Sequence, residues 1–417
     1  MIDSLMRDPE PPHILLVNPV GVIGGAERVL LACARAIKES KPDARVSALL
    51  MGDGPLRPAL EALGVTVLVV PMPERLASAG DSRLRTSSWW GRARAIVGLG
   101  LRLPATKAYV RVLKSAIEGV RPTLIHAHGF KAMFLLARNV PTGVPLVWHV
   151  HDFCSERPMV SRLVRLLSNR VTRAIAVSDA VAHDLASVAP ALPVTVVRNG
   201  VDLSHFSPAP RDGADLDRLA GLASDAGGIV RVGLVATYAD WKGHEVFLRS
   251  LARQGPTVRG YVVGGPIYAT AGSQVTLDGL RELAQSLGLA GRVGFVPFQV
   301  DPADVYRMLD VVVHASTRPE PFGLTVAEAM ACGRAVVVSA AGGALELFEE
   351  GVTAIGHPPG DVDALARAID RLVREPGLRA RLGGHAHAHM QALFGHERFA
   401  RELLGVHEEV ARGRSIS

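Results

Sequence analysis

Short runs of β-branched and other apolar residues alternate with stretches of helical periodicity along the whole chain. Parallel strands need a crossover between them, which is usually a helix, so this alternation predicts parallel sheets flanked by helices. The predicted strands are residues 13–18, 45–50, 65–70, 123–127, 146–150, 174–177 and 194–198, and then 230–235, 259–263, 293–296, 311–314 and 335–338. The clearest predicted helices are residues 26–39, 178–187, 324–332, 361–374 and 397–411.

A segment rich in Pro, Gly, Asp and Ser, residues 199–228, separates the two series of strands. This composition is typical of a linker. The length of 417 residues agrees with a division there, because single cores tend to split beyond about 250–300 residues. We therefore predict a first domain over residues 1–200 and a second over residues 201–395.

Composition and termini predict a globular protein of a reducing compartment. The chain is 48% hydrophobic and 21% charged, so it can bury enough apolar surface to fold. The acidic, proline-containing N-terminus does not resemble a signal peptide, and the apolar runs are too short to cross a bilayer. The three cysteines are widely spaced and form no C-x-x-C pair, which argues against a disulfide or a zinc site. A cytoplasmic protein, soluble or peripheral on the inner face of the membrane, is expected.

The segment of residues 318–333, RPEPFGLTVAEAMACG, carries the most informative chemistry. Glu320 precedes a Pro-Phe-Gly turn, and Glu328 lies more than one turn inside the predicted helix. If the helix starts near Gly323, its unpaired amides would favour a phosphate. Glu320 is then placed to accept hydrogen bonds from sugar hydroxyls, and Glu328 to bind the hydroxyls of a ribose. The alternative is that Glu320 is an ordinary loop carboxylate and Glu328 a solvated helix residue.

This combination of motifs resembles the family 4 glycosyltransferases of the GT-B fold, which are retaining enzymes that use nucleotide sugars. The resemblance covers nearly the whole chain, and its specificity comes from the order and spacing of several short motifs. Besides the glutamate pair, these are GGAE at 24–27, IHAHG at 125–129, HVHDF at 149–153, RNGVD at 198–202 and WKGHEVFL at 241–248. It implies two Rossmann-like domains whose parallel sheets face each other across a cleft, and a C-terminal helix, residues 396–417, that packs back on the first domain.

The resemblance assigns roles in the second domain. Glu320 is expected to contact the donor sugar, and Glu328 to hold the ribose. Lys242 is expected to neutralise the diphosphate together with an arginine five positions upstream, but that position is Thr237 here. Thr237 would give a neutral hydrogen bond, and Arg318 is a candidate to replace the missing charge. The main-chain amides expected to contact the diphosphate are those of Phe322, Gly323 and Leu324.

In the first domain, candidate residues follow the ends of predicted strands, where parallel sheets bind ligands. By resemblance, His151 matches the histidine that faces the donor sugar, and His149 is an acceptor-side candidate. His128 is a second acceptor-side candidate, because we expect at most one of His126 and His128 to face the cleft. The loop residues Gly24 and Gly25 are expected to contact the reacting groups of the donor.

No metal is expected at the active site. Asp215 and Asp217 spell D-x-D, as do Asp361 and Asp363, but neither pair follows an apolar strand. Asp361 is better explained as the N-cap of a helix. A further set, His385, His387 and His389, is expected to lie on a solvated surface.

Residues 82–117 form a basic, amphipathic segment without a single acidic residue. Basic side chains interleaved with Trp89, Trp90 and aliphatic residues suit the surface of an anionic membrane. A second basic run follows at residues 157–173. A solvated basic face is the alternative, and the chain has no recognised nucleic-acid module.

The sequence therefore predicts a metal-independent, retaining glycosyltransferase without a cofactor. It would transfer a sugar from a nucleotide-diphosphate donor to the hydroxyl of a glycan or lipid-linked acceptor, in cell-envelope or polysaccharide synthesis. Rival functions on the same fold are a nucleotide-sugar epimerase and a sugar phosphorylase. A third, motivated by Thr237, is a catalytically weakened protein that only binds nucleotide sugars.

Overall fold

A computed structural model describes residues 11–77, 103–223, 228–266 and 274–413. The chain divides into two compact units. The first comprises Met1–Val177, Val181–Val197 and Phe399–Ser417, and the second comprises Ser178–Ala180 and Arg198–Arg398. Most of the basic segment predicted at residues 82–117 lies outside the described residues.

The first unit is built on a seven-stranded parallel sheet with the order β3-β2-β1-β4-β5-β6-β7. Two series of strands grow outward from β1 in opposite directions, which is the Rossmann-like arrangement. The strands are β1 (His13–Asn18), β2 (Arg45–Leu50), β3 (Thr66–Val69), β4 (Leu124–His128), β5 (Leu146–Val150), β6 (Arg173–Ala176) and β7 (Val194–Val196).

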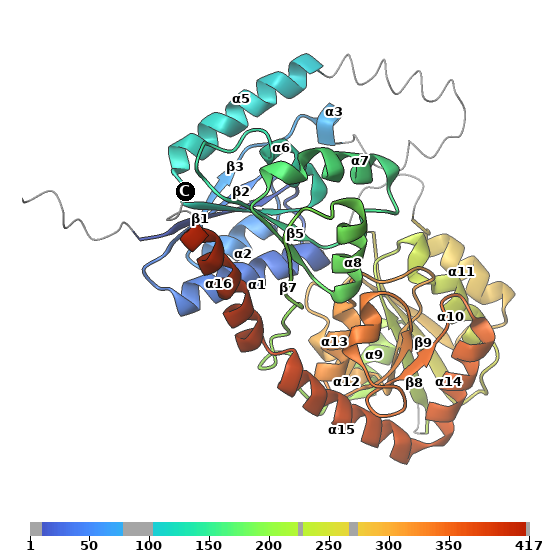
Figure 1. Ribbon diagram of the computed structural model, residues 1–417. Coiled ribbons are helices and arrows are strands. Elements are labelled where there is room, and N and C mark those ends of the chain that lie inside the picture. The colour runs from blue at the N-terminus through green and yellow to red at the C-terminus, as the bar shows by residue number, and fades with distance from the viewer. Residues whose placement is uncertain (1–10, 78–102, 224–227, 267–273, 414–417) are drawn as a thin grey trace, which may run out of the picture. The chain divides into compact units, whose positions relative to one another are not determined.

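Helices cover both faces of this sheet, with α1 and α2 on one face and α5, α6 and α7 on the other (Figure 1). Every residue of β1, β4 and β5 is buried, as expected for a parallel sheet covered on both faces. The helices are α1 (Gly25–Ser40), α2 (Leu56–Ala62), α3 (Glu74–Ala77), α5 (Leu103–Val120), α6 (Phe130–Leu136), α7 (Pro158–Leu167) and α8 (Asp179–Val188).

The second unit repeats this design around a six-stranded parallel sheet with the order β10-β9-β8-β11-β12-β13. Helix α10 contacts α11 and α14, while α12 contacts α9 and α13. The strands are β8 (Val230–Val235), β9 (Val258–Gly264), β10 (Val293–Pro297), β11 (Val311–His314), β12 (Ala335–Ser339) and β13 (Ile355–His357). The helices are α9 (Gly213–Leu219), α10 (His244–Leu251), α11 (Leu277–Ser286), α12 (Ala303–Met308), α13 (Leu324–Ala331), α14 (Val362–Arg374) and α15 (Pro376–Leu393).

The predicted alternation of strands and helices is confirmed, and most predicted strands end within two residues of the observed ones. The short edge strand β13 was not predicted, because its residues Ile-Gly-His form no run of β-branched residues. The last helix, α16 (His396–Arg412), begins in the second unit and continues into the first. The proposed domain boundaries at residues 200 and 395 stay a prediction.

The linker predicted at residues 199–228 is wrong over part of its length. Its residues 213–219 form α9, in which Leu216 and Asp217 are buried. Leu216 packs this helix into the second unit, while Asp217 forms ion pairs with Arg231 (2.7 Å) and Arg259 (3.1 Å) and accepts a hydrogen bond from the Tyr261 hydroxyl. The polar composition of the segment concealed a single buried carboxylate that attaches the helix to β8 and β9.

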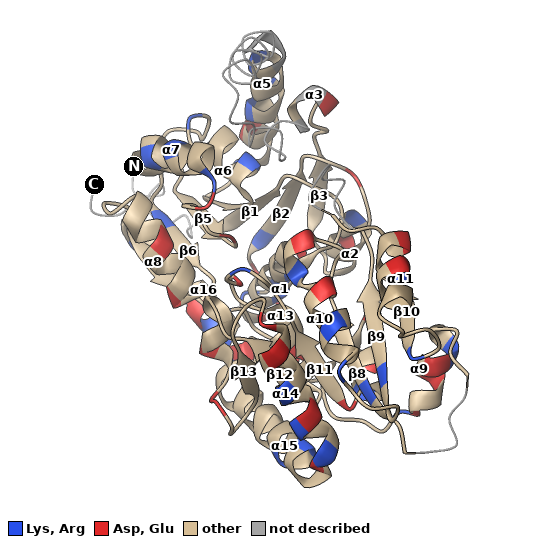
Figure 2. Cartoon of the chain, turned by 90° about the vertical axis from the view of Figure 1, so that its right-hand side faces the viewer, with Lys and Arg blue, Asp and Glu red and all other residues tan. Residues whose placement is uncertain are grey.

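Lys, Arg, Asp and Glu lie mainly on the helices and loops of each unit (Figure 2), and the side chains of these residues are usually exposed. Asp217 is an exception, since its side chain is fully buried. Replacing it leaves two arginines, each under one-fifth exposed, without their counter-charge.

We expect Asp217→Asn to lower the free energy of unfolding of the second unit by about 3 kcal/mol, because removal of one partner leaves uncompensated buried charge. Urea unfolding followed by circular dichroism measures the change. Asp215→Asn is the matched control, because it removes an exposed carboxylate from the same helix and should cost less than about 0.5 kcal/mol. Equal effects of the two variants would contradict a stabilising role for the buried pair.

Candidate functional site

The turn before α13 is positioned by the carboxyl end of β11. The strand ends at His314, and the chain then runs through residues 315–322 to Gly323, which caps α13 with a positive φ of 102°. L-residues rarely adopt this backbone conformation, so a glycine is required at the cap. The helix predicted at residues 324–332 is therefore confirmed, together with its start at Gly323.

Glu320 is the centre of a buried polar cluster. Its carboxylate oxygens lie 2.9 and 3.0 Å from Lys242 Nζ. One of these oxygens also lies 3.0 Å from His314 Nε2 and accepts a hydrogen bond of 3.0 Å from Ser316 Oγ. The Glu320 residue is only 8% exposed, so this carboxylate is neither a surface charge nor a free loop residue.

The surroundings of Glu320 keep it ionised. Burial by itself would raise its pKa, but the positive charge of Lys242 and the hydrogen bond from His314 outweigh burial and hold the pKa well below its usual range. The site therefore presents a carboxylate that accepts hydrogen bonds at neutral pH.

The main chain of Glu320 is fixed by the loop that follows β12. Glu320 N–H donates to the Ala341 carbonyl at 3.2 Å, and Gly343 N–H donates to the Glu320 carbonyl at 2.7 Å. Gly342 has a φ of +67°, and a Cβ there would lie 2.5 Å from the Glu320 carbonyl oxygen. The two glycines let this loop pack directly against the backbone that carries the carboxylate.

The amides at the start of α13 are available to a ligand. In the part of the chain that the structure describes, the N–H groups of Phe322, Gly323 and Leu324 have no hydrogen-bond acceptor. The first N–H groups of a helix have no partner within the helix, and its dipole makes this end electropositive. The turn thus offers adjacent amide donors directly after Glu320.

Glu328 lies on the same helix and is 5% exposed. One of its oxygens accepts a hydrogen bond of 2.9 Å from the hydroxyl of Tyr306, a residue of α12 that is fully buried. The tyrosine fixes the orientation of the carboxylate. The alternative of a solvated helix residue is excluded by this burial.

Lys242 is held by a short turn between β8 and α10. The next residue, Gly243, has a φ of +73°, and a Cβ there would lie 1.9 Å from the Ala315 carbonyl oxygen. The Trp241 carbonyl accepts a hydrogen bond of 2.7 Å from Thr317 N–H. Lys242 Nζ also lies 3.9 Å from the centre of the Trp241 ring. Close packing of this turn on the end of β11 thus requires a glycine after Lys242.

The position of the expected arginine is occupied by the half-buried Thr237, just after β8. Arg318, the suggested replacement, is 43% exposed in its side chain and lies 3.9 Å from Asp240. Within the described chain its ion pair is with Asp240 and not with Glu320. Lys242 is accordingly the cation that contacts the central carboxylate.

In the first unit, the predicted histidines lie together at the ends of β4 and β5. His128 Nδ1 is 3.0 Å from His151 Nε2, and the rings of His149 and His151 stack at 4.3 Å. Burial lowers the pKa of His151 to about 3, and with neighbouring charges it lowers the pKa values of His126, His128 and His149 well below the usual range. These imidazoles are neutral at pH 7.

The expectation that at most one of His126 and His128 faces the cleft is wrong in its reason, because it requires the two side chains to point to opposite faces of the sheet. Residues two apart on a strand point to the same face, and the two rings lie 4.6 Å apart in one cluster. Burial, and not opposite orientation, limits what each can contact.

Gly24 is the N-cap residue of α1 and Gly25 is its first residue, so the helix begins one residue before the predicted start at Ala26. Gly24 N–H donates to the Glu27 carboxylate at 3.1 Å, and Glu27 is buried. The glutamate of the GGAE motif therefore satisfies one amide at this helix start. An anionic ligand at Gly24 would have to compete with that carboxylate.

The D-x-D sequences have structural roles. Asp361 caps α14 by accepting a hydrogen bond of 2.9 Å from Ala364 N–H, which confirms the predicted N-cap. Asp217 forms the buried ion pairs described above. His385 and His387 contact the carbonyls of Val352 and Ala331.

Sequence analysis missed His314, Ser316 and Tyr306 as partners of the two glutamates. His314 and Ser316 follow one another along the end of β11, so their position at a carboxyl strand end was a usable signal. Tyr306 carried no such signal, because its contact with Glu328 depends on how α12 packs on α13.

Two family models match the chain. The model described as "Glycosyl transferases group 1" matches residues 230–389, and "Glycosyltransferase Family 4" matches residues 55–205. A D-inositol 3-phosphate glycosyltransferase of Kribbella flavida is 30% identical over 414 residues, with 88% of this chain and 96% of that protein covered. The chain belongs to the family 4 glycosyltransferases. The first of the two matches contains Lys242, Glu320 and Glu328.

Other relatives and solved structures support the same family assignment. The enzyme of the same description from Mycobacterium ulcerans is 33% identical, with 73% of this chain and 68% of that protein covered. Among solved structures, Anabaena Alr3699/HepE in complex with UDP-glucose has a TM-score of 0.77 at 26% identity, covering 95% of this chain and 99% of that chain. Sucrose-phosphate synthase from Thermosynechococcus elongatus shares the fold with a TM-score of 0.77 at 20% identity.

The lowered pKa of Glu320 predicts a specific dependence of stability on pH. Its unfolded value is about 4.3, so the folded state holds fewer protons at this group. Its stabilising contribution is complete above that value and is lost as the pH falls through it toward the lower folded pKa. The urea midpoint of Glu320→Gln should therefore decline less than that of the wild type between about pH 6 and pH 3.

Glu245→Gln is the control, because Glu245 is an exposed carboxylate of the same unit. Its midpoint should follow that of the wild type across the pH series. Parallel curves for wild type and Glu320→Gln would refute the lowered pKa.

Proposed function

We propose that this glycosyltransferase moves a sugar, with retention of configuration, from a nucleotide-diphosphate donor to a hydroxyl acceptor without a metal ion. The observation that carries the proposal is the succession of a buried, ionised Glu320, a turn with three unpaired amides and Glu328 on the helix that follows. Sugar, diphosphate and ribose follow one another in the same order in a nucleotide sugar.

The diphosphate would bind at the start of α13. Adjacent amides and the helix dipole favour an anion there, and Gly323 lets the ligand approach the backbone closely. Lys242 has three donor hydrogens, so it can bind phosphate while it keeps a contact with Glu320. The charge that develops on the leaving diphosphate would be stabilised by this lysine and these amides.

Glu320 would bind hydroxyls of the donor sugar. A nucleophilic role is disfavoured, because the carboxylate is held by Lys242, His314 and Ser316 at 2.9–3.0 Å. We therefore propose front-face attack by the acceptor, guided by the departing diphosphate. Glu328, oriented by Tyr306, would accept the hydroxyls of the ribose.

A uridine nucleotide is the first donor to test. The Anabaena HepE structures contain UDP and UDP-glucose, and that protein is 26–27% identical to this chain. Thr237 replaces one cation of the expected diphosphate site, so binding would depend more strongly on Lys242 and the amides.

The first unit would supply the acceptor side, with residues 1–200 as acceptor domain, residues 201–395 as donor domain and residues 396–417 as a returning helix. His151 would donate or accept a hydrogen bond as a neutral ring, since burial lowers its pKa to about 3. His128 contacts His151 directly and would orient it. Gly25 is better placed than Gly24 to meet the donor, because the Gly24 amide is already bound by Glu27.

A thermal-shift screen over uridine, guanosine and adenosine diphosphate sugars tests donor binding, since a ligand of the folded state raises its stability. We expect one nucleotide series to raise the melting temperature, and Lys242→Met to weaken that binding about 10-fold or more. Lys38→Met, which removes a half-buried lysine of α1, is the control and should bind donor normally.

Nuclear magnetic resonance of the product tests retention, and the product should keep the anomeric configuration of the donor.

Each rival function predicts another result in the same assay. A phosphorylase would need phosphate as acceptor, and an epimerase would change the donor without transfer. A binding protein would be stabilised by donor but would neither transfer nor hydrolyse it. An inverted anomeric product would refute the retaining mechanism.

We further propose a lipid-linked acceptor, reached by peripheral contact with an anionic membrane. None of the described helices is long and apolar enough to cross a bilayer. Basic and apolar side chains are nevertheless exposed together on α7, where Met159 is 51% and Leu166 is 56% exposed beside Arg162 and Arg165. The described part of α5 likewise exposes Lys107, Arg111, Lys114 and, at 57%, Val112.

An apolar hollow of about 480 Å³ adjoins α5. It is lined by Val69, Val70, Pro71, Pro73, Ala108, Tyr109 and Val112. An acyl or polyprenyl chain is the kind of ligand that such a lining favours.

Flotation with liposomes tests this proposal. We expect binding to vesicles that contain phosphatidylglycerol, and weaker binding to neutral vesicles or at high salt, because each basic side chain near an anionic surface contributes about 1 kcal/mol. Met159→Glu with Leu166→Glu should reduce flotation several-fold. Arg371→Glu, an exposed charge reversal in the second unit, should not. Absence of flotation at any salt concentration would exclude membrane association.

A further inference from the structure

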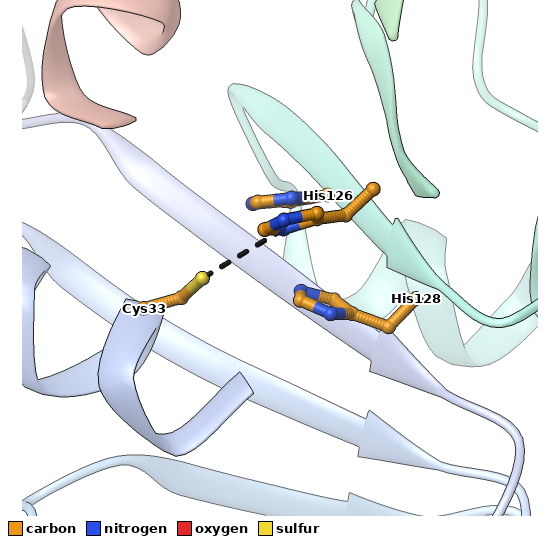
Figure 3. Close-up of side chains that lie close together, drawn as sticks. Cys33, His126 and His128 are labelled. Atoms are coloured by element: carbon orange, nitrogen blue, oxygen red, sulfur yellow. Dashed lines mark hydrogen bonds between the residues drawn. The ribbon is translucent and has the colours of Figure 1, made fainter. Parts of the chain in front are cut away.

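We propose that Cys33, His126, His128 and His149 form a buried site for a zinc-class divalent cation inside the first unit. This site is separate from the donor site of the second unit, and it shares His128 with the contact that would orient His151. One ligand atom from each of the four residues lies within 4.8 Å of the others, and all four residues are buried with no exposed surface. Figure 3 shows the Cys33 thiol on α1 facing the rings that project from the sheet.

The chemistry of these side chains fits that cation. Zn²⁺ takes four ligands in a tetrahedron, with bonds of about 2.0–2.1 Å to histidine nitrogen and about 2.3 Å to cysteine sulfur. Ligand atoms of such a site lie roughly 3.3–3.7 Å apart. Contraction of the observed cluster by about an ångström, through side-chain rotation, would reach that geometry.

Unpartnered ring nitrogens point to a missing ligand. His126, His128 and His149 each keep a fully buried Nε2 that has no hydrogen-bond partner among the described residues. Burial of an unpaired polar atom costs about 1–3 kcal/mol, so three in one place require an explanation. A cation that accepts their lone pairs would satisfy all three together.

The other ring nitrogens are already oriented, as in known metal sites. His126 Nδ1 lies 3.2 Å from His407 Nε2, and His128 Nδ1 lies 3.0 Å from His151 Nε2. Metal-bound histidines usually make such a second hydrogen bond, which fixes the ring and its tautomer. His149 Nδ1 lies 3.9 Å from Cys33 Sγ. When the cation binds, the thiol would release its proton to solvent, and the thiolate would bind the cation in place of this contact.

Such an ion would connect α1 to two central strands of the first unit. Cys33 lies on α1, His126 and His128 on β4, and His149 on β5. The sequence spacing concealed the set, because Cys33 and His149 are 116 positions apart. The expected role is stabilisation of the first unit, since a metal that binds only the folded state raises its stability.

The test uses the full-length, untagged chain expressed in medium supplemented with zinc or with cobalt. We expect about one metal ion per chain after gel filtration, measured by inductively coupled plasma mass spectrometry. The cobalt form should show the strong visible absorption of a tetrahedral site and a thiolate-to-cobalt charge-transfer band. X-ray absorption of the zinc form should show one sulfur at about 2.3 Å and nitrogens at about 2.0 Å.

Cys33→Ser should abolish the charge-transfer band, and His149→Gln should lower metal content at least 10-fold. Matched controls are Cys154→Ser, a buried thiol of the same unit, and His244→Gln, a buried histidine of the second unit whose ring nitrogens also lack partners. Both controls should retain the metal. Circular dichroism of each variant checks that it is folded.

Two outcomes would overturn the proposal. One is a wild-type chain that contains neither zinc nor cobalt after growth in supplemented medium. The other is adventitious surface binding, which would be identified by metal that all variants retain equally or by an X-ray absorption spectrum without a sulfur ligand. The absorption measurement on the wild type decides the question even if Cys33→Ser does not fold.

Discussion

The ion pair between Glu320 and Lys242 is the interaction on which the candidate site depends. A carboxylate that is 8% exposed needs compensation for the water it has lost, and Lys242, His314 and Ser316 supply it. These partners come from the ends of neighbouring strands β8 and β11. The pair can form because parallel strands all present their carboxyl ends at one edge of the sheet.

That constraint explains the glycines around the site. Gly243 allows the lysine turn to pack on the Ala315 carbonyl, and Gly342 allows the loop after β12 to pack on the Glu320 carbonyl. Gly323 then starts α13 with its amides free. All three glycines have a positive φ, and Gly243 and Gly342 also allow a close approach of backbone to backbone.

The buried carboxylates of the second unit and the histidine cluster of the first unit differ in how their polar atoms are satisfied. In the second unit, Asp217, Glu320 and Glu328 each have named partners, so their burial is compensated. In the first unit, neutral histidines gather without enough partners, and the Nε2 atoms of His126, His128 and His149 are among the buried ring nitrogens of the described residues that lack a hydrogen bond. The first pattern is typical of a site held ready for a polar ligand, and the second is typical of a site that a cation completes.

The sequence by itself determined the alternation of strands and helices, the glutamate turn and the start of α13. Those features depend on local periodicity, glycine geometry and motif order, which are all properties of neighbouring residues. Only the tertiary structure decided that α9 is anchored by a buried Asp217, that Tyr306 orients Glu328 and that four residues from α1, β4 and β5 meet. These are contacts between distant segments, and their geometry depends on how helices pack on the sheets, about which local periodicity carries no information.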